Sequence, residues 1–464
     1  MTTKPFIIAA VGALSVMPAT AQKDITPQML QQFQNSYKSE GADKALDNAV
    51  AANDIKVLAL NNETMAQFDT EFSNKVNSKG VTNQRGSGRC WLFSGLNVLR
   101  AKMIAKYNLG AMEFSENYCF FYDQLEKSNL FLQAVIDNGK KPMDDRTVDW
   151  LFHNPLSDGG TFCGVADVVS KYGLVPSTVM PETFSSNSTG TYSMLLKTKL
   201  REYGLTLRKM IADGKSDKQV LAKKVEMLGV VYKMLVRCFG VPPQKFSYTL
   251  RNAASKVIST KEYTPKSFYD EHIGIDLTDN YFMFMNDPSR DYYKTYEIDL
   301  DRHAYDGHNW VFLNVPMQDI KDMAISSIKD STMMYMSCDV GKCNDSKRGY
   351  SDPDVYNYGE IFGVDFPMDK KERISTFASA STHAMTLMAV DIDEQGKTKK
   401  WMVENSWGPS SGFKGHIIMT DKWLDEYLFR LVVAKKYVPA RLADMMKQKP
   451  IMLPAWDPLF QPEQ

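Results

Sequence analysis

The chain has 464 residues, of which 44% are hydrophobic and 24% are charged, and its 55 basic side chains equal its 55 acidic ones. This length predicts two or three structural lobes, and the composition excludes a disordered chain. A net charge of zero provides no general attraction to nucleic acid or to an anionic membrane, so we expect neither as a partner.

The N-terminal stretch MTTKPFIIAAVGALSVMPATAQKD departs from this composition. Lys4 precedes an apolar run from Phe6 to about Met17, and Ala19-Thr20-Ala21 follows. A basic start, a short apolar core and a small-x-small ending predict a secretory signal over residues 1–21 and a secreted or periplasmic protein. The run is too short for a membrane-spanning helix. The alternatives are a buried N-terminal helix and, if the segment is not removed, a cytoplasmic protein.

A helical, polar pattern extends from Asp24 to about Ala66 and is followed by NQRGSGRCWLFSG, residues 83–95. Apolar residues recur at helical spacing after Cys90, so we expect a helix that begins there and stops at Gly110. The start of a helix offers unpaired backbone N–H groups and a positive dipole, and both favour thiolate over thiol. Most cysteines are buried structural residues, but this position favours a nucleophile. Glycines at 86 and 88 permit the close approach.

The middle of the chain is predicted to be helical. Asp158-Gly159-Gly160 and Gly164 indicate turns before a helix from Val165 to Tyr172. The stretch FSSNSTGTYS, residues 184–193, is rich in serine and threonine and indicates a linker. Residues 195–239 are strongly helical and charged, and we interpret them as part of an inserted helical subdomain over residues 186–300.

The last third contains short apolar runs that predict strands at residues 310–315, 333–338, 384–391 and 401–404. A helical half followed by a β-rich half predicts an α+β fold with two lobes and a cleft between them. The expected domains are the signal (1–21), an N-terminal arm with a helical lobe (22–185), the insertion (186–300), a β-rich lobe (301–450) and a C-terminal tail (451–464).

Six cysteines are too few for a disulfide scaffold, and we expect the five besides Cys90 to be buried thiols, with an occasional disulfide as the alternative. Cys338 and Cys343 lie close together but lack a matching Cys/His pair, so a zinc site is only weakly supported. We therefore expect no metal.

A nucleophilic thiol needs a base, and His383 is the best candidate among six histidines. It lies in SASTHAMTLMAVDID, where a turn of small residues leads into a predicted strand. His303 and His308 occupy a polar turn and are expected to be solvated, and His416 is expected to begin a strand. Nothing distinguishes His153 and His272, which have polar, irregular surroundings.

The imidazole also needs an orienting group. Asn405, in WMVENSWG, follows a predicted strand and could accept a hydrogen bond from one ring nitrogen, with Trp407 shielding that bond. An isolated Asn-Ser-Trp-Gly turn would be an ordinary strand end. The backbone N–H of Cys90 and the side chain of Gln84 could stabilise a developing oxyanion.

These motifs together resemble the papain superfamily of cysteine peptidases. The resemblance rests on Gln84, SGRCW at 87–91, THA at 382–384 and ENSWG at 404–408. Further stretches narrow it to the bleomycin hydrolase and bacterial aminopeptidase C branch: VTNQ (81–84), DGGTF (158–162), KYGLVP (171–176), CDVGK (338–342) and LPAWDP (453–458). Cys90 and His383 are 293 residues apart, whereas papain-type enzymes separate them by roughly 130–150, and an inserted helical lobe would supply the excess.

The resemblance implies that Cys90 is the nucleophile, His383 the general base and acid, Asn405 the orienting residue and Gln84 the oxyanion donor. It also implies substrate contacts at Gly159 and Gly160, and a chain end whose carboxylate, on Gln464, binds the α-amine of the substrate. The implied activity is removal of N-terminal residues from peptides by a homo-hexamer without a cofactor.

Three alternatives remain open at this stage. The cleft could be open, since the ending LFQPEQ is bulkier and more polar than is typical of the branch, and the enzyme would then be an endopeptidase. The chain could instead be an inactive binding or assembly protein, or an acyltransferase with a second substrate pocket.

Overall fold

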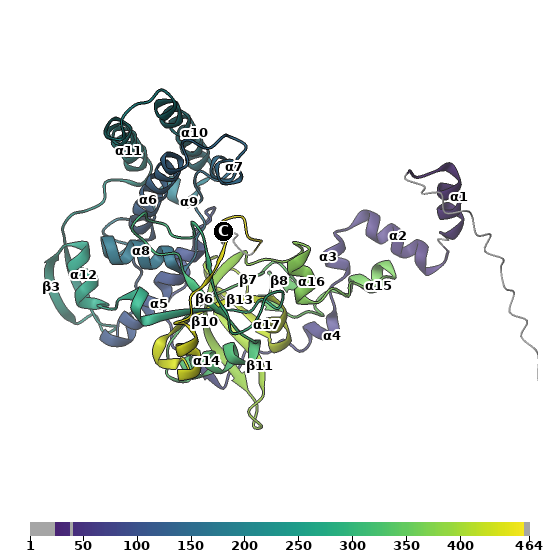
Figure 1. The fold of residues 1–464 in the computed structure, drawn as a ribbon. Helices are drawn as coiled ribbons and strands as arrows, with labels where there is room; N and C mark the ends of the chain where they lie inside the picture. Colours follow the sequence, from purple (N-terminus) through teal and green to yellow (C-terminus); the bar gives the residue numbers. More distant parts are fainter. Residues whose placement is uncertain (1–23, 38–39, 459–464) are drawn as a thin grey trace, which may run out of the picture. The chain divides into compact units, whose positions relative to one another are not determined.

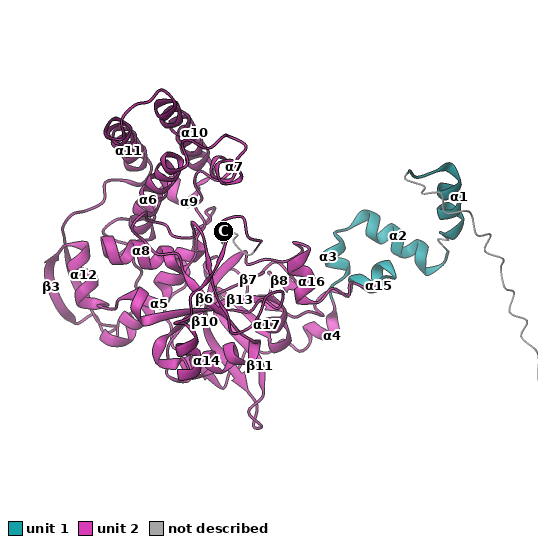
Figure 2. Cartoon of the chain, in the orientation of Figure 1, with its two compact units in different colours: residues 1–60, 358–364 teal, residues 61–357, 365–464 magenta. Residues whose placement is uncertain are grey.

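The computed structural model describes residues 24–37 and 40–458, which form two compact units (Figure 2). Unit 1 comprises residues 1–60 and 358–364, and unit 2 comprises residues 61–357 and 365–464. The predicted signal segment, residues 1–21, and the chain end at Gln464 lie outside the described residues.

Unit 1 consists of short helices whose side chains remain largely exposed. Its helices are α1 Pro27–Ser36, α2 Ala42–Ala52, α3 Ile55–Leu58 and α15 Tyr358–Phe362. Within its described residues none of these helices buries a side chain, and Phe33 and Val57 are 50% and 69% exposed. The helical pattern predicted from Asp24 to Ala66 is thus confirmed, and it extends into unit 2 as α4 Asn62–Met65.

The first half of unit 2 is a helical lobe. Its helices are α5 Cys90–Tyr107, α6 Glu116–Asp137, α7 Arg146–His153, α8 Phe162–Tyr172, α9 Phe184–Asn187, α10 Gly190–Ala212 and α11 Asp217–Phe239. Helices α6, α10 and α11 pack against one another at the top of Figure 1. In α5, every residue from Cys90 to Arg100 is buried, which makes it the central helix of the lobe.

The predicted helix at Cys90 is confirmed, although it ends before Gly110. Asn108 adopts a left-handed conformation with φ 48° and closes the last turn, because asparagine tolerates this conformation better than most residues. The linker predicted for FSSNSTGTYS is wrong. Thr183 and Ser186 form a capping box that begins α9, and α10 begins at Gly190, so the hydroxyl groups start helices instead of breaking them.

Among the described residues, unit 2 contains one twelve-stranded sheet, and all of its strands except β1 follow the helical lobe. Its strand order is β14-β5-β6-β4-β13-β7-β10-β11-β12-β9-β8, with β1 also paired to β10. The central strands are β7 Met334–Cys338, β10 His383–Ile392, β11 Thr398–Glu404, β12 His416–Thr420 and β13 Leu428–Ala434. The others are β1 Asn74–Lys75, β4 Tyr281–Met285, β5 Thr295–Ile298, β6 Val311–Asn314, β8 Asn344–Asp345, β9 Tyr350–Ser351 and β14 Ile451–Leu453. The four predicted strand regions correspond to β6, β7, β10 and β11 and are confirmed.

The region expected to form an inserted helical subdomain is only partly helical. Helices α10 and α11 confirm the helical structure predicted for residues 195–239. Beyond them, β2 Phe246–Arg251 and β3 Val257–Tyr263 form a separate hairpin, and β4 and β5 join the large sheet. The remaining helices are α12 Pro265–His272, α13 Leu277–Asn280, α14 Met317–Lys329, α16 Lys370–Ser375, α17 Asp421–Tyr427, α18 Ala440–Met445 and the 3-10 helix Lys435–Tyr437.

The two halves of unit 2 meet where α5 packs against β10. At this contact the hydroxyl of Thr386 in β10 donates to the backbone oxygen of Ser94 in α5 at 3.3 Å. Strands β7 and β11 pair with β10 on either side, so the start of β10 is held within the interior of the sheet. The α+β class is confirmed, and the junction brings the start of α5 to the start of β10.

Candidate active site

A tight turn places Cys90 at the first position of α5. In the preceding turn, the backbone N–H of Gly88 donates to the Asp158 carboxylate at 2.9 Å, and a Cβ at Gly88 would lie 3.1 Å from the carboxyl carbon of Asp158. Arg89 supports the turn with two hydrogen bonds to Glu182 at 3.0 and 2.8 Å. Glycine at position 88 is therefore favoured by a close approach, as the sequence indicated.

The sulfur of Cys90 contacts the start of β10. The backbone N–H of Ala384 donates to Cys90 Sγ at 3.4 Å, although the two residues are 294 positions apart. Ala384 directly follows His383, the first residue of β10. Both Cys90 and His383 are buried, with 0% and 2% of their surface exposed. The structure thus brings the predicted nucleophile and the predicted base to the same point.

Asn405 binds the imidazole of His383. The Nε2 atom of the ring lies 2.8 Å from Asn405 Oδ1, and the ring lies 4.9 Å from that of Trp407, measured between centroids. Asn405 comes directly after β11, which pairs with β10 in antiparallel register. This bond uses Nε2, so the ring nitrogen left for proton transfer is Nδ1.

The backbone fixes the orientation of Asn405. Its N–H donates to the Gly415 oxygen at 3.0 Å, and its Oδ1 also accepts from the Ser406 N–H at 2.8 Å. An amide held in this way carries no charge and keeps its oxygen directed at the imidazole. This arrangement suits the orienting role predicted from the sequence.

Gln84 joins the same turn. Its backbone N–H donates to the Ser406 oxygen at 2.8 Å, and its Oε1 accepts from the Ser406 hydroxyl at 2.6 Å. Its Nε2 donates to the Ser87 oxygen at 2.7 Å. Because an amide nitrogen carries two hydrogens, a second N–H remains for a ligand. Cys90, His383, Asn405 and Gln84 therefore form one cluster.

A buried ion pair behind this cluster was missed by sequence reasoning. The Arg100 guanidinium in α5 binds the Glu404 carboxylate, which immediately precedes Asn405, and both side chains are almost fully buried. Glu404 also accepts from the Ser78 hydroxyl at 2.6 Å, and Arg100 donates to the backbone oxygen of Lys79 at 2.7 Å. The pair links the thiol helix to the strand that carries Asn405. A charged residue within an apolar run, as in LNVLRAKM, was the signal available for it.

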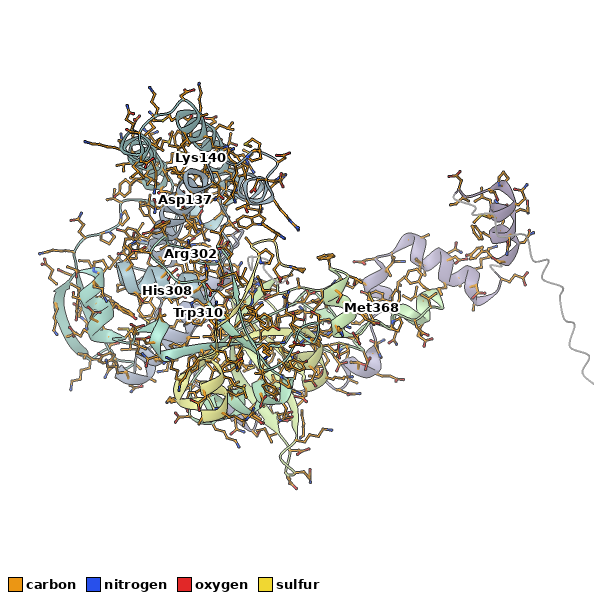
Figure 3. The ribbon with its side chains drawn as sticks, viewed as in Figure 1. Asp137, Lys140, Arg302, His308, Trp310 and Met368 are labelled. Atoms are coloured by element: carbon orange, nitrogen blue, oxygen red, sulfur yellow. The ribbon has the colours of Figure 1, made fainter. Side chains whose placement is uncertain are left out.

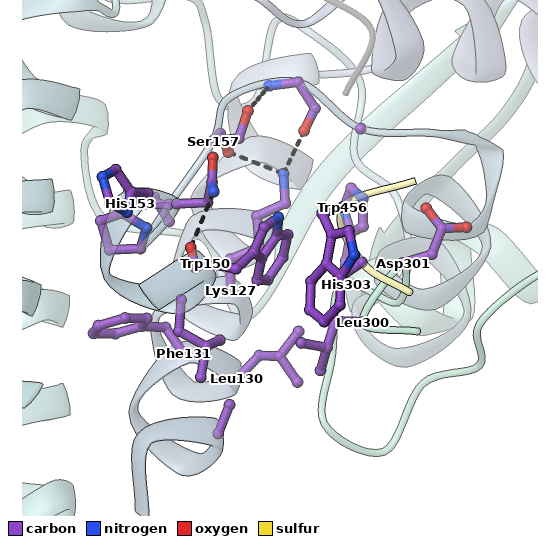
Figure 4. Close-up of a pocket in the computed structure, with 18 of the residues that line it drawn as sticks. Lys127, Leu130, Phe131, Trp150, His153, Ser157, Leu300, Asp301, His303 and Trp456 are labelled. Carbon is purple, nitrogen blue, oxygen red and sulfur yellow. Dashed lines mark hydrogen bonds between the residues drawn. The ribbon is translucent and has the colours of Figure 1, made fainter. Parts of the chain in front are cut away.

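Gly159 and Gly160 line a cavity of about 510 Å³ (Figure 4). The cavity is also lined by Lys127, Trp150, His303 and the C-terminal segment 455–458. A Cβ at Gly160 would lie 2.9 Å from the ring of Trp91, the neighbour of Cys90, so this wall of the cavity reaches the thiol helix. Gln464, the third predicted substrate contact, lies outside the described residues.

Three of the other histidines differ from the expectations: His303, His272 and His153, which was expected in an irregular segment and is the last residue of α7. His303, expected to be solvated, is only 4% exposed because Asp123 in α6 binds its ring at 2.5 Å. His272, expected in an irregular polar segment, is the last residue of α12 and is 2% exposed. His416 begins β12 as predicted, while His308 and His153 are exposed. The loop that carries Arg302 and His308 lies between the helical lobe and the sheet (Figure 3).

None of the six cysteines forms a disulfide. Burial raises the pKa of the Cys119 and Cys163 thiols well above the usual value, which keeps both protonated. Within residues 24–37 and 40–458, no group of three or more His, Cys, Asp or Glu side chains is arranged to hold a metal ion. Over the same residues, no helix has both the length and the apolar character needed to span a membrane.

Comparisons with known proteins agree with this geometry. The model of the Peptidase C1-like family matches residues 24–460. Aminopeptidase C of Lactobacillus delbrueckii subsp. lactis is 34% identical over 442 residues, which cover 94% of this chain and 98% of the relative. Bleomycin hydrolase of Homo sapiens is 36% identical over 423 residues, covering 89% and 93%. The crystal structure of pepw from Lactobacillus rhamnosis HN001 superimposes with a TM-score of 0.91 at 36% identity, covering 95% and 99%.

Proposed function

The chain belongs to the Peptidase C1-like family, and from this premise we propose that it is a cysteine aminopeptidase that removes N-terminal residues from peptides. It is an enzyme of the cysteine peptidase class, and its curated relatives carry the names aminopeptidase C and bleomycin hydrolase. One observation supports the choice of residues most directly: the backbone N–H of Ala384, the residue after His383, donates a hydrogen bond to Cys90 Sγ.

The proposed reaction begins with attack of the Cys90 thiolate on the carbonyl carbon of the first residue of the peptide. His383, oriented by Asn405 through Nε2, donates its Nδ1 proton to the leaving amine as the C–N bond breaks. The backbone N–H of Cys90 and the Nε2 of Gln84 stabilise the oxyanion. A water molecule then gives its proton to His383 and attacks the thioester, which releases the amino acid and restores the thiolate.

Restriction to the first residue is proposed to come from the chain end. The segment 455–458 lines the cavity beside Gly159 and Gly160, and six residues follow it. An extended segment of this length reaches about 20 Å, which allows the carboxylate of Gln464 to bind the α-amine of a substrate. Gly159 and Gly160 are proposed to contact the substrate backbone.

The first test uses aminoacyl reporters with a free or an acetylated α-amine. We expect cleavage of the free form only, and Cys90→Ala should lower kcat by at least about 10⁴-fold. Cys238→Ala, which changes a half-buried thiol elsewhere, is the matched control and should retain full activity. Cleavage by the Cys90→Ala variant would contradict the assignment of Cys90 as the nucleophile.

A second test concerns the aminopeptidase mode. Removal of residues 459–464 should let the enzyme cleave the acetylated reporter as well. Cleavage of that reporter by the intact chain would instead favour the open-cleft endopeptidase. The absence of any hydrolysis, with no labelling of Cys90 by an epoxide inhibitor, would favour the inactive binding protein.

Export and assembly are proposed on separate grounds. The N-terminal pattern supports cleavage after Ala21, which N-terminal sequencing of the protein from its native host checks. The exposed apolar side chains of unit 1, such as Phe33 and Val57, support burial against further copies of the chain in a homo-hexamer. Light scattering after size-exclusion chromatography measures the number of copies, and a monomeric mass would contradict the hexamer.

A further inference from the structure

A second cluster of buried polar groups lies next to the cavity. It consists of Trp91 in α5, Asp123 and Lys127 in α6, and His303 in the loop after β5. Asp123 is fully buried and His303 is 4% exposed. None of these side chains has a role in the reaction proposed above, so their burial needs another explanation.

The carboxylate of Asp123 is the centre of the cluster. Its Oδ1 lies 2.5 Å from His303 Nδ1, and its Oδ2 lies 3.0 Å from Lys127 Nζ and 2.8 Å from Gln124 Nε2. Burial works to raise the pKa of Asp123, but the charge of Lys127 and the hydrogen bonds from His303 and Gln124 outweigh it and lower the pKa. Burial and the nearby Lys127 lower the pKa of His303, and they outweigh the charge and hydrogen bond of Asp123, which raise it. The ring is therefore neutral and donates its Nδ1–H to the carboxylate.

The ring of His303 is held by contacts with several elements. Its edge meets the Trp91 ring at 4.8 Å between centroids and an angle of 68°. A Cβ at Gly160 or at Gly164 would lie 2.3 or 2.2 Å from its Cε1 atom. Its backbone N–H donates to Asp167 at 3.2 Å. Only glycine at these two positions leaves room for the imidazole, so the ring and the glycine turn fit each other closely.

The same cluster binds three consecutive carbonyl groups of the segment 157–159. Lys127 Nζ donates to the oxygens of Ser157 and Gly159 at 3.0 and 2.7 Å, as Figure 4 shows. The indole N–H of Trp91 donates to the oxygen of Asp158 at 2.9 Å. All three carbonyls therefore point into the protein, and the shape of the segment that leads to Gly160 is fixed.

We propose that Asp123, Lys127 and His303 are positioning residues that hold the segment 157–160 in the shape that binds the backbone of the peptide substrate. This inference rests on the proposed function, because it takes Gly159 and Gly160 as substrate contacts. Asp123 keeps Lys127 and His303 in place. Lys127 fixes the carbonyl groups of Ser157 and Gly159, and the ring of His303 packs against Gly160. The cluster then governs substrate binding and leaves the chemistry at Cys90 unchanged.

The experiment compares Asp123→Asn and His303→Gln with the wild type. We expect KM for a free aminoacyl reporter to rise about tenfold or more, with kcat within about threefold. The inactivation rate by iodoacetamide, which needs only the thiol and its imidazole, should stay within about twofold of the wild type. Asp137→Asn changes an exposed carboxylate on the same helix (Figure 3) and should alter neither.

A merely structural role would lower kcat, alkylation rate and thermal stability together, and that result would overturn the proposal. An unchanged KM in a folded variant would overturn it as well. If both variants fail to fold, Lys127→Met provides the same measurement, because its side chain is partly exposed and the change removes the hydrogen bonds to Ser157 and Gly159 together with the ion pair to Asp123. A wild-type chain without activity would refute the proposed function instead, so the two failures are distinguishable.

Discussion

Two of the buried imidazoles in unit 2, those of His383 and His303, have similar surroundings and different partners. His383 is bound to the amide of Asn405 and lies against Trp407, whereas His303 is bound to the carboxylate of Asp123 and lies against Trp91. Both rings are almost fully buried. Each ring thus has one side-chain oxygen and one indole as neighbours, but the sites differ in the ring nitrogen that is bound and in the charge of the hydrogen-bond acceptor.

This difference teaches how a buried histidine can be given either a chemical or a structural role. A neutral amide lets the imidazole gain and lose a proton without leaving a buried carboxylate unpaired. The carboxylate of Asp123 already has its charge balanced by Lys127, so the ring of His303 has only to donate a hydrogen bond. We therefore expect proton transfer at His383 and a fixed, neutral ring at His303.

The largest expected effect separates the two rings directly. His383→Ala should lower kcat by at least about 10⁴-fold, because the acceptor and donor of the proton is lost. His303→Ala should leave kcat within about tenfold of the wild type. Steady-state kinetics on a free aminoacyl reporter gives both values, and equal losses of kcat would break the comparison.

The second prediction concerns the buried ion pair of Arg100 and Glu404, which lies next to Asn405. Arg100→Met leaves Glu404 buried without its cation and should lower the free energy of unfolding by about 3–5 kcal/mol. Lys209→Met, which removes an exposed pair with Asp213, should change it by less than about 1 kcal/mol. Urea unfolding measures both changes. Similar values would mean that the buried pair stabilises the fold around Asn405 no more than an exposed pair does.

The third prediction tests the loop that holds His303. Burial raises the pKa of Asp167 from 3.8 to about 6, although backbone N–H groups of His303, His308 and Ala304 lower it. Between these values the folded chain keeps a proton that the unfolded chain has lost, so the contribution of Asp167 to stability falls as pH rises through this window and is constant above it.

Relative to Asp167→Asn, the wild type should therefore lose about 2–3 kcal/mol of unfolding free energy between pH 4 and pH 7. Urea unfolding of both proteins at several pH values provides the difference. Between pH 7 and pH 8 the two curves should run parallel. A constant difference over the whole range would contradict the origin assigned to the effect.

The smallest expected effect comes from replacing Asn405, the hydrogen-bond partner of His383. Asn405→Asp gives His383 the kind of acceptor that His303 has, and a carboxylate stabilises the protonated ring. The alkaline limb of the pH–rate profile should move upward by about one pH unit. Asn405→Ala should lower kcat without that displacement. An unshifted profile in the Asp variant would mean that the charge of the partner is not what distinguishes the two sites.

The sequence predicted the first imidazole site well because its determinants are local. A turn before a helix, a turn before a strand and a turn after a strand each identify one residue, and Cys90, His383 and Asn405 lie at these positions in the structure. Their assembly from distant parts of the chain was expected from the resemblance to a known family.

The second site could not be predicted in this way. DRHAYDGHNW is a polar stretch, and only the partner at Asp123, 180 residues earlier, makes His303 a buried residue. Strands β4 and β5 were missed for a similar reason, since pairing with distant strands such as β13 and β14 decides their conformation. The hairpin of β2 and β3, which pair with each other, was missed within a stretch read as helical. The linker at 184–193 was wrong because the same hydroxyl groups serve turns and helix starts equally well.

The contact between Cys90 and Ala384 spans 294 positions of the chain, which has a consequence for biosynthesis. At translation rates of about 5–20 residues per second, the ribosome makes the thiol roughly 15–60 seconds before the residues that complete the site. During that interval the nascent polypeptide holds a cysteine without its imidazole. Proteolytic capacity thus arises only near the end of synthesis, when β10 and β11 can pair.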